Sequence, residues 1–241
     1  MKDLGKIVIH IPAREGSKRV RSKNLRYIAG APLLSYTVNA SLGTKYRESV
    51  YVNTESETIA ALSESIGAKT YLRPKDLSGD MVTSDQYNMN IIEKLKPDTL
   101  IQINPVCPLL LSSDIESIIS VYINGPEYID TLITCTKTQM QCFCDEEPVN
   151  IDLKSQLAPT QQNPAVSICN WAVTIWDAHR FTERFNKNGF AVFGNRRLLY
   201  PIHPLKAVKI SIEEDYDMAE FLLNKNKMKD SEKQNIIYWK S

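Results

Sequence analysis

Histidine, net charge and long apolar runs are all scarce in this chain of 241 residues. Its three histidines lie far apart in the sequence, so they form no metal-ligand or catalytic-triad spacing. Lysine and arginine number 29 against 28 acidic residues, a balance that argues against a general nucleic-acid binder. No apolar run is long enough to span a bilayer, and residues 1–4 lack the architecture of a signal peptide. We therefore expect a cytoplasmic protein.

The cysteines fit neither a disulfide framework nor a zinc site. There are five of them, an odd number, and no pair has the CxxC spacing. We expect reduced and mostly buried thiols. Cys107 has no paired histidine nearby in the sequence, so a buried structural role is favoured over that of a nucleophile.

Two common phosphate-binding loops are missing as well, the GxxxxGK[ST] pattern and the GxGxxG pattern. A basic loop occupies the corresponding place, after an apolar run at 7–11 that is typical of a buried strand. The loop, residues 13–24, holds one glycine and five lysines or arginines. On composition alone, a polyanion site and a plain basic surface loop remain equally open.

The physical case for a polyanion site rests on three side chains and one turn. A turn at Gly16-Ser17 lets backbone N–H groups approach phosphate oxygens closely. Arg14 can bind a phosphate with two parallel hydrogen bonds, whereas Lys18 and Lys23 act as mobile point charges.

Strand and helix patterns alternate through the first half of the chain. This alternation predicts a mainly parallel sheet with crossover helices on its two faces, a three-layer α/β/α fold. The predicted strands are 7–11, 49–54, 69–72, 99–104 and 130–135, and the predicted helices are 32–42, 56–66, 85–95 and 115–123.

The alternation stops at about residue 139. From 139 to 165 the sequence is polar and has no strong periodicity, so we interpret it as an arm inserted into one domain that covers residues 1–241. Beyond the arm we expect strands at 166–176, 190–193 and 208–210, a helical turn at 178–185 and a last helix from Glu213.

Polar side chains follow several of the predicted strands where those strands end. Ligands of open parallel sheets bind outside the carboxyl ends of the strands, so these side chains should line one crevice. Each amide, taken singly, is better explained as satisfied within the protein; taken together on one edge, they favour a site. The set comprises Arg14 to Asn24 in the basic loop, Asn53-Thr54-Glu55, Arg73, Asn104 and Asn170.

Six segments also resemble one protein family. They are Ile11-Pro12-Ala13-Arg14-x-Gly16-Ser17-Lys18-x4-Lys23-Asn24, Val52-Asn53-Thr54-Glu55, Tyr71-Leu72-Arg73-Pro74-x2-Leu77-x2-Asp80, Ile103-Asn104-Pro105-Val106-Cys107-Pro108-Leu109, Asn170-Trp171-Ala172 and Ile210-Ser211-Ile212-Glu213-Glu214-Asp215-Tyr216-Asp217-x-Ala219. Together they are similar to motifs of the CMP-N-acylneuraminate cytidylyltransferases, also called CMP-sialic acid synthetases. The resemblance runs from residue 7 to about 222, and it implies a Rossmann-like sheet of the nucleotide-diphospho-sugar transferase type.

The resemblance implies nucleotidyl transfer, in which a nine-carbon keto-acid sugar attacks the α-phosphate of CTP and expels pyrophosphate. The matched catalytic residues are Arg14, Lys18 and Lys23. The resemblance implies nucleotide binding by Ala13, Arg14, Gly16, Ser17, Lys18, Asn24, Asn53, Arg73 and Asp80. It implies sugar binding by Asn104 and Asn170. It also implies Mg²⁺ as a cofactor and a homodimer that pairs through the arm.

The chain departs from the family at the place where metal-binding aspartates are expected. Those two positions are Lys209 and Ser211 here, so the metal ligands are unknown. The acidic residues that follow are better explained as the first turn of a helix. Two alternatives therefore stay open, a sugar nucleotidyltransferase of different base or sugar and a nucleotide-binding relative with little catalysis.

Overall fold

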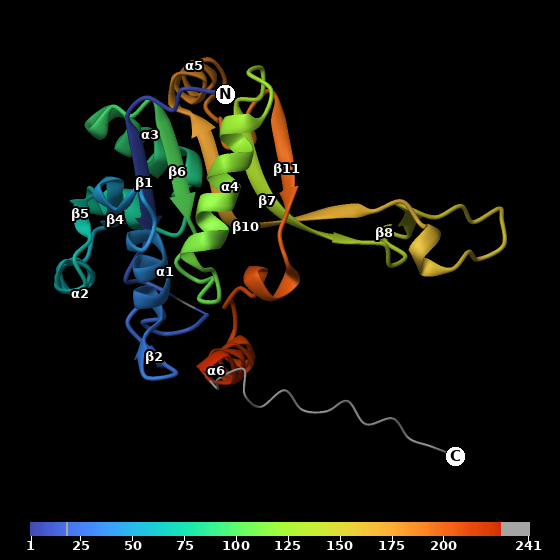
Figure 1. Ribbon diagram of the computed structural model, residues 1–241, viewed down its shortest axis with the longest axis horizontal. Coiled ribbons are helices and arrows are strands. Elements are labelled where there is room, and N and C mark those ends of the chain that lie inside the picture. Colours follow the sequence, from blue (N-terminus) through green and yellow to red (C-terminus); the bar gives the residue numbers. More distant parts are fainter. Residues whose placement is uncertain (18, 228–241) are drawn as a thin grey trace.

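A seven-stranded sheet forms the centre of the protein (Figure 1). The structure is a computed structural model, and it describes residues 1–17 and 19–227. The strand order is β11-β7-β10-β6-β1-β4-β5. β10 runs antiparallel to both of its neighbours, and the other pairs are parallel. The strands are β1 (Ile7–Pro12), β4 (Val50–Thr54), β5 (Lys69–Leu72), β6 (Thr99–Ile103), β7 (Thr131–Thr138), β10 (Val166–Asp177) and β11 (Arg197–Pro201).

The central strands are buried on both faces, which is why their sequences are nearly continuous apolar runs. β1 lies between β4 and β6, with Ile9 opposite Val50 on one side and Ile101 on the other. Residues alternate between the two faces, so Ile9 and Ile11 pack in one layer while Val8 and His10 face the other. The predicted mainly parallel α/β/α fold is confirmed.

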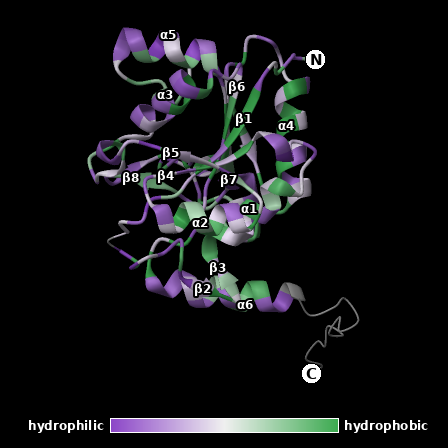
Figure 2. Ribbon diagram, turned by 90° about the vertical axis from the view of Figure 1, so that its left-hand side faces the viewer, coloured by the Kyte–Doolittle hydropathy of each residue, from purple (hydrophilic) through white to green (hydrophobic). Residues whose placement is uncertain are grey.

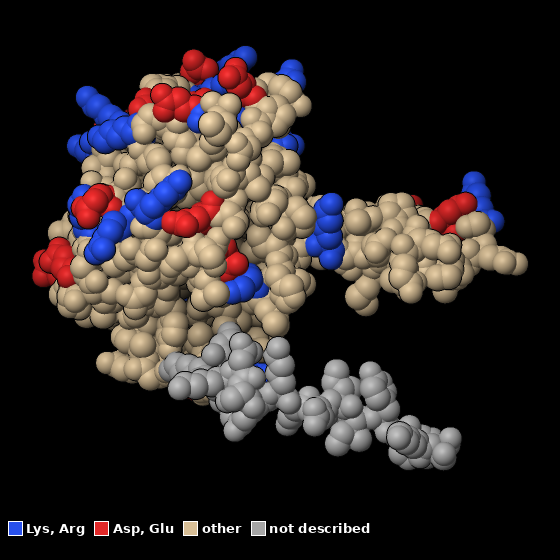
Figure 3. Space-filling view, viewed as in Figure 1, with Lys and Arg blue, Asp and Glu red and all other residues tan. Residues whose placement is uncertain are grey.

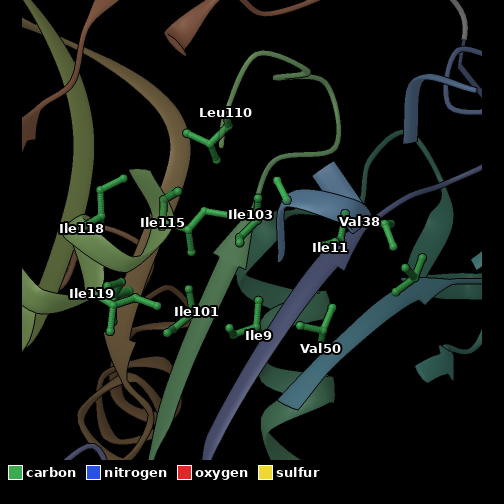
Figure 4. Close-up of a cluster of buried hydrophobic side chains, with 14 of the residues drawn as sticks. Ile9, Ile11, Val38, Val50, Ile101, Ile103, Leu110, Ile115, Ile118 and Ile119 are labelled. Carbon is green, nitrogen blue, oxygen red and sulfur yellow. The ribbon is translucent and has the colours of Figure 1, made fainter. Parts of the chain in front are cut away.

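Helices cover both faces of the sheet. α1 (Leu33–Leu42), α2 (Glu57–Ser65) and α4 (Ser112–Asn124) pack on the face of Ile9 and Ile11, in the cluster drawn in Figure 4. α3 (Ser84–Leu95) and α5 (Ala178–Asn188) cover the opposite face (Figure 2). α6 (Glu213–Lys227) packs on a third cluster beside the small hairpin of β2 (Tyr27–Ile28) and β3 (Ala31–Pro32). Short 3₁₀ turns complete the fold: η1 (Arg47–Ser49), η2 (Lys75–Ser78), η3 (Thr160–Gln162) and η4 (Pro204–Ala207).

Local signals set the helix ends. A capping box joins Thr83 and Gln86 at the start of α3, and Gly67 follows α2 with a φ of +97°, a conformation that favours glycine. α4 begins at Ser112, three residues earlier than predicted, because the Asp114 carboxylate accepts the Leu111 N–H at 2.8 Å. None of the described helices is long and apolar enough to cross a bilayer.

Two predicted strands are wrong, and one strand of the central sheet was missed, as were the two-residue strands of the small hairpins. Residues 190–193 form a turn in which Asp85 accepts the N–H groups of Ala191 and Val192, so these donors need no strand partner. Residues 208–210 are irregular, and Ile210 makes one backbone bond to Val106 at 3.0 Å. The edge strand β11 lies between these two segments and pairs with β7.

The ends of β7 and β10 continue as a paired ribbon away from the body and carry the segment 139–165 (Figure 1). This arm includes the hairpin of β8 (Phe143–Cys144) and β9 (Glu147–Pro148). Side-chain amides hold the arm together. Asn150 Nδ2 donates hydrogen bonds to the carbonyls of Met140 and Pro164. Gln139 Nε2 donates to the Asn163 carbonyl, and Asn163 Nδ2 donates to the Gln139 carbonyl. Because amides replace a packed core, the sequence of the arm has no apolar periodicity.

Candidate active site

Two adjoining hollows lie at the carboxyl ends of the central strands. The first has a volume of about 330 Å³, and the second about 620 Å³. They share Ser84, Tyr87, Gln102 and Asn104. Residues of α3 and of the end of β6 therefore form the boundary between the two hollows. The first is lined additionally by Pro12, Arg14, Arg73, Leu77, Ser78, Gly79, Asp80, Val82 and Pro105, and the second by Asp85, Trp171, Phe190, Val192, Phe193 and Lys209.

Arg14 reaches across the first hollow from the end of β1. Its Nη1 lies 2.9 Å from Asp80 Oδ1 and donates to the Ser78 carbonyl at 3.3 Å. Both partners of the ion pair keep about two-fifths of their side-chain surface exposed, at 38% and 43%. The structure thus brings together Arg14, Arg73 and Asp80, three of the residues that the sequence predicts for nucleotide binding.

A buried ion pair between Arg73 and Glu55 supports the wall of the first hollow. Arg73 Nη2 lies 3.0 Å from Glu55 Oε2, with side-chain exposures of 3% and 14%. The other oxygen of Glu55 accepts the Glu15 N–H at 2.9 Å, so one carboxylate fixes both the basic loop and Arg73. The Arg73 guanidinium also lies 5.6 Å from the centre of the Tyr87 ring. Burial raises the pKa of Tyr87 to about 12, so its hydroxyl stays protonated at neutral pH.

The rest of the basic loop turns back on the protein. Ala13 donates to the Asn53 carbonyl at 2.9 Å, and Asn24 Nδ2 donates to the Arg14 carbonyl at 2.9 Å. Ser17 donates to the Glu15 carbonyl at 3.0 Å. A Cβ placed on Gly16 would meet no atom within 4 Å, so the space in front of this residue is open. Lys18 lies outside the described residues.

Lys23 is the half-buried cation of the loop. Its Nζ donates to the Ile210 carbonyl at 2.9 Å, and the Tyr216 hydroxyl donates to the Lys23 carbonyl at 2.7 Å. Burial lowers the pKa of Lys23, and the positive charges of Arg19, Lys209 and Arg14 add to the effect. Positive charge therefore gathers between the basic loop and the segment before α6, a setting that favours an anion.

The three predicted asparagines have different surroundings. Asn104 lines both hollows, and its Oδ1 accepts the Val106 N–H at 3.4 Å. Asn170 Oδ1 accepts the Ala172 N–H and the Thr134 hydroxyl, while its buried Nδ2 has no partner. Asn53 is fully buried, its Nδ2 lies 3.5 Å from His10 Nδ1, and it lines neither hollow.

Sequence reasoning missed several residues of the hollows, chiefly Tyr87, Gln102 and Trp171. Tyr87 belongs to the first turn of α3, and its hydroxyl donates to Gln102 Oε1 at 3.4 Å. The alternation along β6 offered one usable signal, because Gln102 lies two residues before Asn104 and therefore on the same face.

The described side chains do not fit a magnesium ion held by the protein. Within residues 1–17 and 19–227, no group of three or more histidine, cysteine, aspartate or glutamate side chains lies close enough to hold a metal ion. Asp215 Oδ2 accepts the N–H groups of Ser211 and Ile212 at 2.6 and 3.0 Å, and Glu213 pairs with Arg26. These carboxylates therefore stabilise the start of α6, as the acidic first turn predicts.

Comparison with known proteins decides the family. Residues 7–147, more than half of the chain, match the model of a family described as cytidylyltransferase. The chain belongs to the cytidylyltransferase family. The matched region contains every residue that lines the first hollow, Arg14, Arg73 and Asp80 among them.

Two curated cytidylyltransferase relatives match part of the chain at moderate identity. An N-acylneuraminate cytidylyltransferase of Escherichia coli O18:K1:H7 is 44% identical over 82 residues, 34% of this chain and 20% of that protein. A CMP-N,N′-diacetyllegionaminic acid synthase of Legionella pneumophila is 43% identical over 81 residues, 33% of this chain and 34% of that protein. The matches thus cover 20% and 34% of the length of these relatives.

A solved structure resembles the whole fold. A CMP:2-keto-3-deoxy-manno-octonic acid synthetase complexed with CTP covers 92% of this chain, with 99% of its own length matched and a TM-score of 0.67. The identity is 14%, so this likeness concerns the fold alone.

Proposed function

We propose that this member of the family transfers CMP from CTP to a nine-carbon, sialic-acid-like sugar acid and releases pyrophosphate. One observation carries the proposal: a cation-lined hollow opens into a second, larger hollow at Gln102 and Asn104. A nucleotidyl transfer needs such a pair of compartments, because the donor phosphate and the acceptor hydroxyl must meet in line. Family membership supports the choice of cytidine triphosphate as donor.

The first hollow suits the nucleotide. We assign the triphosphate to Arg14, Lys18 and Lys23, with Ala13, Gly16 and Ser17 as the loop backbone beside it. Gly16 leaves open space for a phosphate, whereas the N–H groups of Ala13 and Ser17 already donate to the Asn53 and Glu15 carbonyls. The shape of the nucleotide pocket is then assigned to Asn24, Asn53, Arg73 and Asp80. Asn53 is buried behind the pocket, where its Nδ2 contacts His10 Nδ1. The transition state spreads negative charge over the phosphate oxygens, so fixed cations stabilise it without a covalent bond between the phosphate and the protein.

The second hollow suits the acceptor. Asn104 stands at its junction with the first hollow, so we assign it to the sugar oxygen that attacks the α-phosphate. Asn170 lines neither hollow and its Nδ2 is buried, so we assign it to sugar binding on the resemblance alone. When the anomeric hydroxyl oxygen bonds to the α-phosphorus, its proton passes to solvent, the bond from the α-phosphorus to the oxygen that bridges the β-phosphate breaks, and pyrophosphate leaves.

Pyrophosphate release tests the proposal directly. The chain is incubated with CTP, Mg²⁺ and N-acetylneuraminic acid, N,N′-diacetyllegionaminic acid or 3-deoxy-manno-octulosonate, with ATP, GTP and UTP as controls. We expect release with CTP and one nine-carbon acid. Release with another base or only with the eight-carbon acid would replace the proposal by a nucleotidyltransferase of different substrate.

Lys209 favours one second candidate, a nucleotide-binding relative with little catalysis. Its ammonium lines the second hollow, at a position where the resemblance implies a metal-binding aspartate. The double variant Lys209→Asp, Ser211→Asp separates the two ideas. We expect its turnover to fall, because a cation beside the phosphates is lost; a rise in Mg²⁺-dependent turnover would show that a missing metal site limits the chain.

We also propose a homodimer formed through the arm. Apolar side chains on the arm remain open to solvent, and on the face shown in Figure 3 the charged residues lie mainly at the base and the tip of the arm. A surface of this kind, held on a projecting ribbon, is typical of an interface with a second chain. The exposed apolar residues of the arm are Met140, Phe143, Val149, Leu153 and Leu157.

A further inference from the structure

Trp171 adopts a backbone conformation that large side chains rarely adopt. Its φ is +59°, in the left-handed region, where the Cβ atom crowds the carbonyl oxygen. A tryptophan gains nothing from this conformation itself, so the surrounding structure must impose it. Residues held in this way concentrate at binding and catalytic sites, which makes the surroundings of the indole worth following.

An irregularity in β10 imposes the conformation. The pairing of β10 with β7 shifts register between Cys169 and Thr174, and Trp171 lies inside the shift. Thr134 closes the gap: its hydroxyl donates to Asn170 Oδ1 at 2.8 Å and accepts the Val173 N–H at 3.0 Å. Bulges of this type re-aim a side chain, and here the re-aimed side chain is the indole that lines the second hollow.

The indole has a fixed aromatic neighbour. Its ring centre lies 5.3 Å from that of Phe193, at an interplanar angle of 72°, an edge-to-face contact. The turn that carries Phe193 is itself held, because Asp85 binds the Val192 N–H at 2.8 Å and Trp176 Nε1 donates to the Val192 carbonyl at 2.7 Å. The wall is therefore rigid before any ligand arrives.

We propose that Trp171 is a specificity-determining residue of the acceptor hollow. Its indole packs against the apolar C–H face of the sugar-acid ring and limits the size of ring substituent that the hollow admits. Aromatic faces suit this contact because they offer a large, rigid apolar surface at little entropic cost. The inference rests on the proposed function, since it assumes that the second hollow takes the acceptor.

The variant Trp171→Gly tests this role against a merely structural one. Glycine accepts a φ of +59° without strain, and this relief offsets part of the packing that the indole gives up, so we expect the melting temperature to fall by no more than about 2–4 °C. We expect the KM for the acceptor to rise about tenfold or more, while the Kd for CTP stays unchanged. Trp171→Phe keeps an aromatic ring at the site and should restore the acceptor KM to within about threefold of the original.

Lys96→Gly is the matched control. Lys96 also has a positive φ, +49°, but it is exposed at the end of α3 and lines neither hollow. Relief of backbone strain at this position should raise the melting temperature slightly, and the acceptor KM should not change. An unchanged acceptor KM in Trp171→Gly, or a loss of CTP affinity in step with lost stability, would overturn the inference.

A binding measurement separates failure of the inference from failure of the proposed function. If the unaltered protein transfers CMP to no acceptor, the proposed function fails. The contact between the Trp171 indole and the sugar is then tested by titrating the unaltered protein with the same sugar acids and measuring tryptophan fluorescence. Quenching that disappears in Trp171→Phe supports the contact, and quenching that persists in this variant, or none at all, rejects it.

Discussion

Glu55 and Arg73 form a buried ion pair that ties the basic loop to the wall of the first hollow. Their closest atoms lie 3.0 Å apart, and the second carboxylate oxygen holds the Glu15 N–H at 2.9 Å. Arg73 Nε has no partner, so the charge of this guanidinium depends on Glu55 for compensation. A single carboxylate thus links stability to the shape of the first hollow.

Glu55→Gln should therefore destabilise the protein and weaken CTP binding together. Removing one partner of a buried pair leaves an uncompensated charge, with a cost of about 3 kcal/mol in the free energy of unfolding. Urea denaturation measures this cost, and calorimetric titration measures the Kd for CTP. The control is Glu57→Gln, an exposed glutamate in the first turn of α2, which should change either quantity little. Equal stability of the two variants would contradict the role assigned to Glu55.

His10 predicts a specific acid sensitivity. Burial, with the positive charge of Arg73 as the second cause, lowers the pKa of His10 to about 3. The unfolded chain, with a pKa near 6.5, binds a proton that the folded chain refuses between these values. Stability is therefore complete above pH 6.5 and falls as the pH drops towards 3, by at most about 1.4 kcal/mol per pH unit from this group.

The variant His10→Gln removes that proton and should flatten the pH dependence. Urea denaturation at several pH values between 3.5 and 7 gives the slope for each protein, and the difference between the slopes isolates His10. His203, exposed at the start of η4, supplies the control His203→Gln, whose slope should match that of the unaltered protein. Identical slopes for all three proteins would remove His10 as the cause.

The central strands of the sheet, β1, β4 and β6, followed from the sequence because they are buried on both faces. Their apolar runs need no information from elsewhere in the chain, and the same holds for helix ends marked by Gly67 or by Thr83 with Gln86. Residues 190–193 look equally apolar, yet Asp85, more than a hundred residues away in the chain, satisfies their backbone and makes them a turn. A long-range contact of this kind leaves no local pattern.

The candidate site divides in the same way. Arg14, Arg73 and Asp80 lie together as the resemblance implies, since they follow strand ends that the topology brings to one edge. Tyr87 and Trp171 escaped prediction for different reasons. Tyr87 faces the hollow only because of how α3 crosses the sheet, and Trp171 enters it through a register shift hidden within a run of β-forming residues.

Lys23 provides a test of the phosphate assignment. Lys23→Met removes one ammonium but keeps the apolar stem, so we expect the Kd for CTP to rise by about tenfold to a hundredfold. The affinity of the variant should also depend less steeply on salt, because fewer charges attract the triphosphate. Calorimetric titration at two salt concentrations measures both effects. Lys45→Met, an exposed lysine between α1 and β4, should leave the Kd unchanged; equal effects of the two substitutions would mean that only general charge matters.

The arm makes the last prediction. Leu157 is 77% exposed and Phe143 53%, although both are large apolar side chains, and we expect a second chain to cover them. Leu157→Asp combined with Phe143→Asp should convert a dimer into a monomer, because charges cannot be buried unpaired in an apolar interface. Light scattering after size-exclusion chromatography gives the mass of each species. The arm of each monomer should stay folded, since amides such as Asn150 hold it from within. Tyr128→Asp places the same charge on an exposed aromatic of the body, and it should leave the dimer intact. A monomeric unaltered chain at the concentration tested, or dissociation by Tyr128→Asp alone, would count against pairing through the arm.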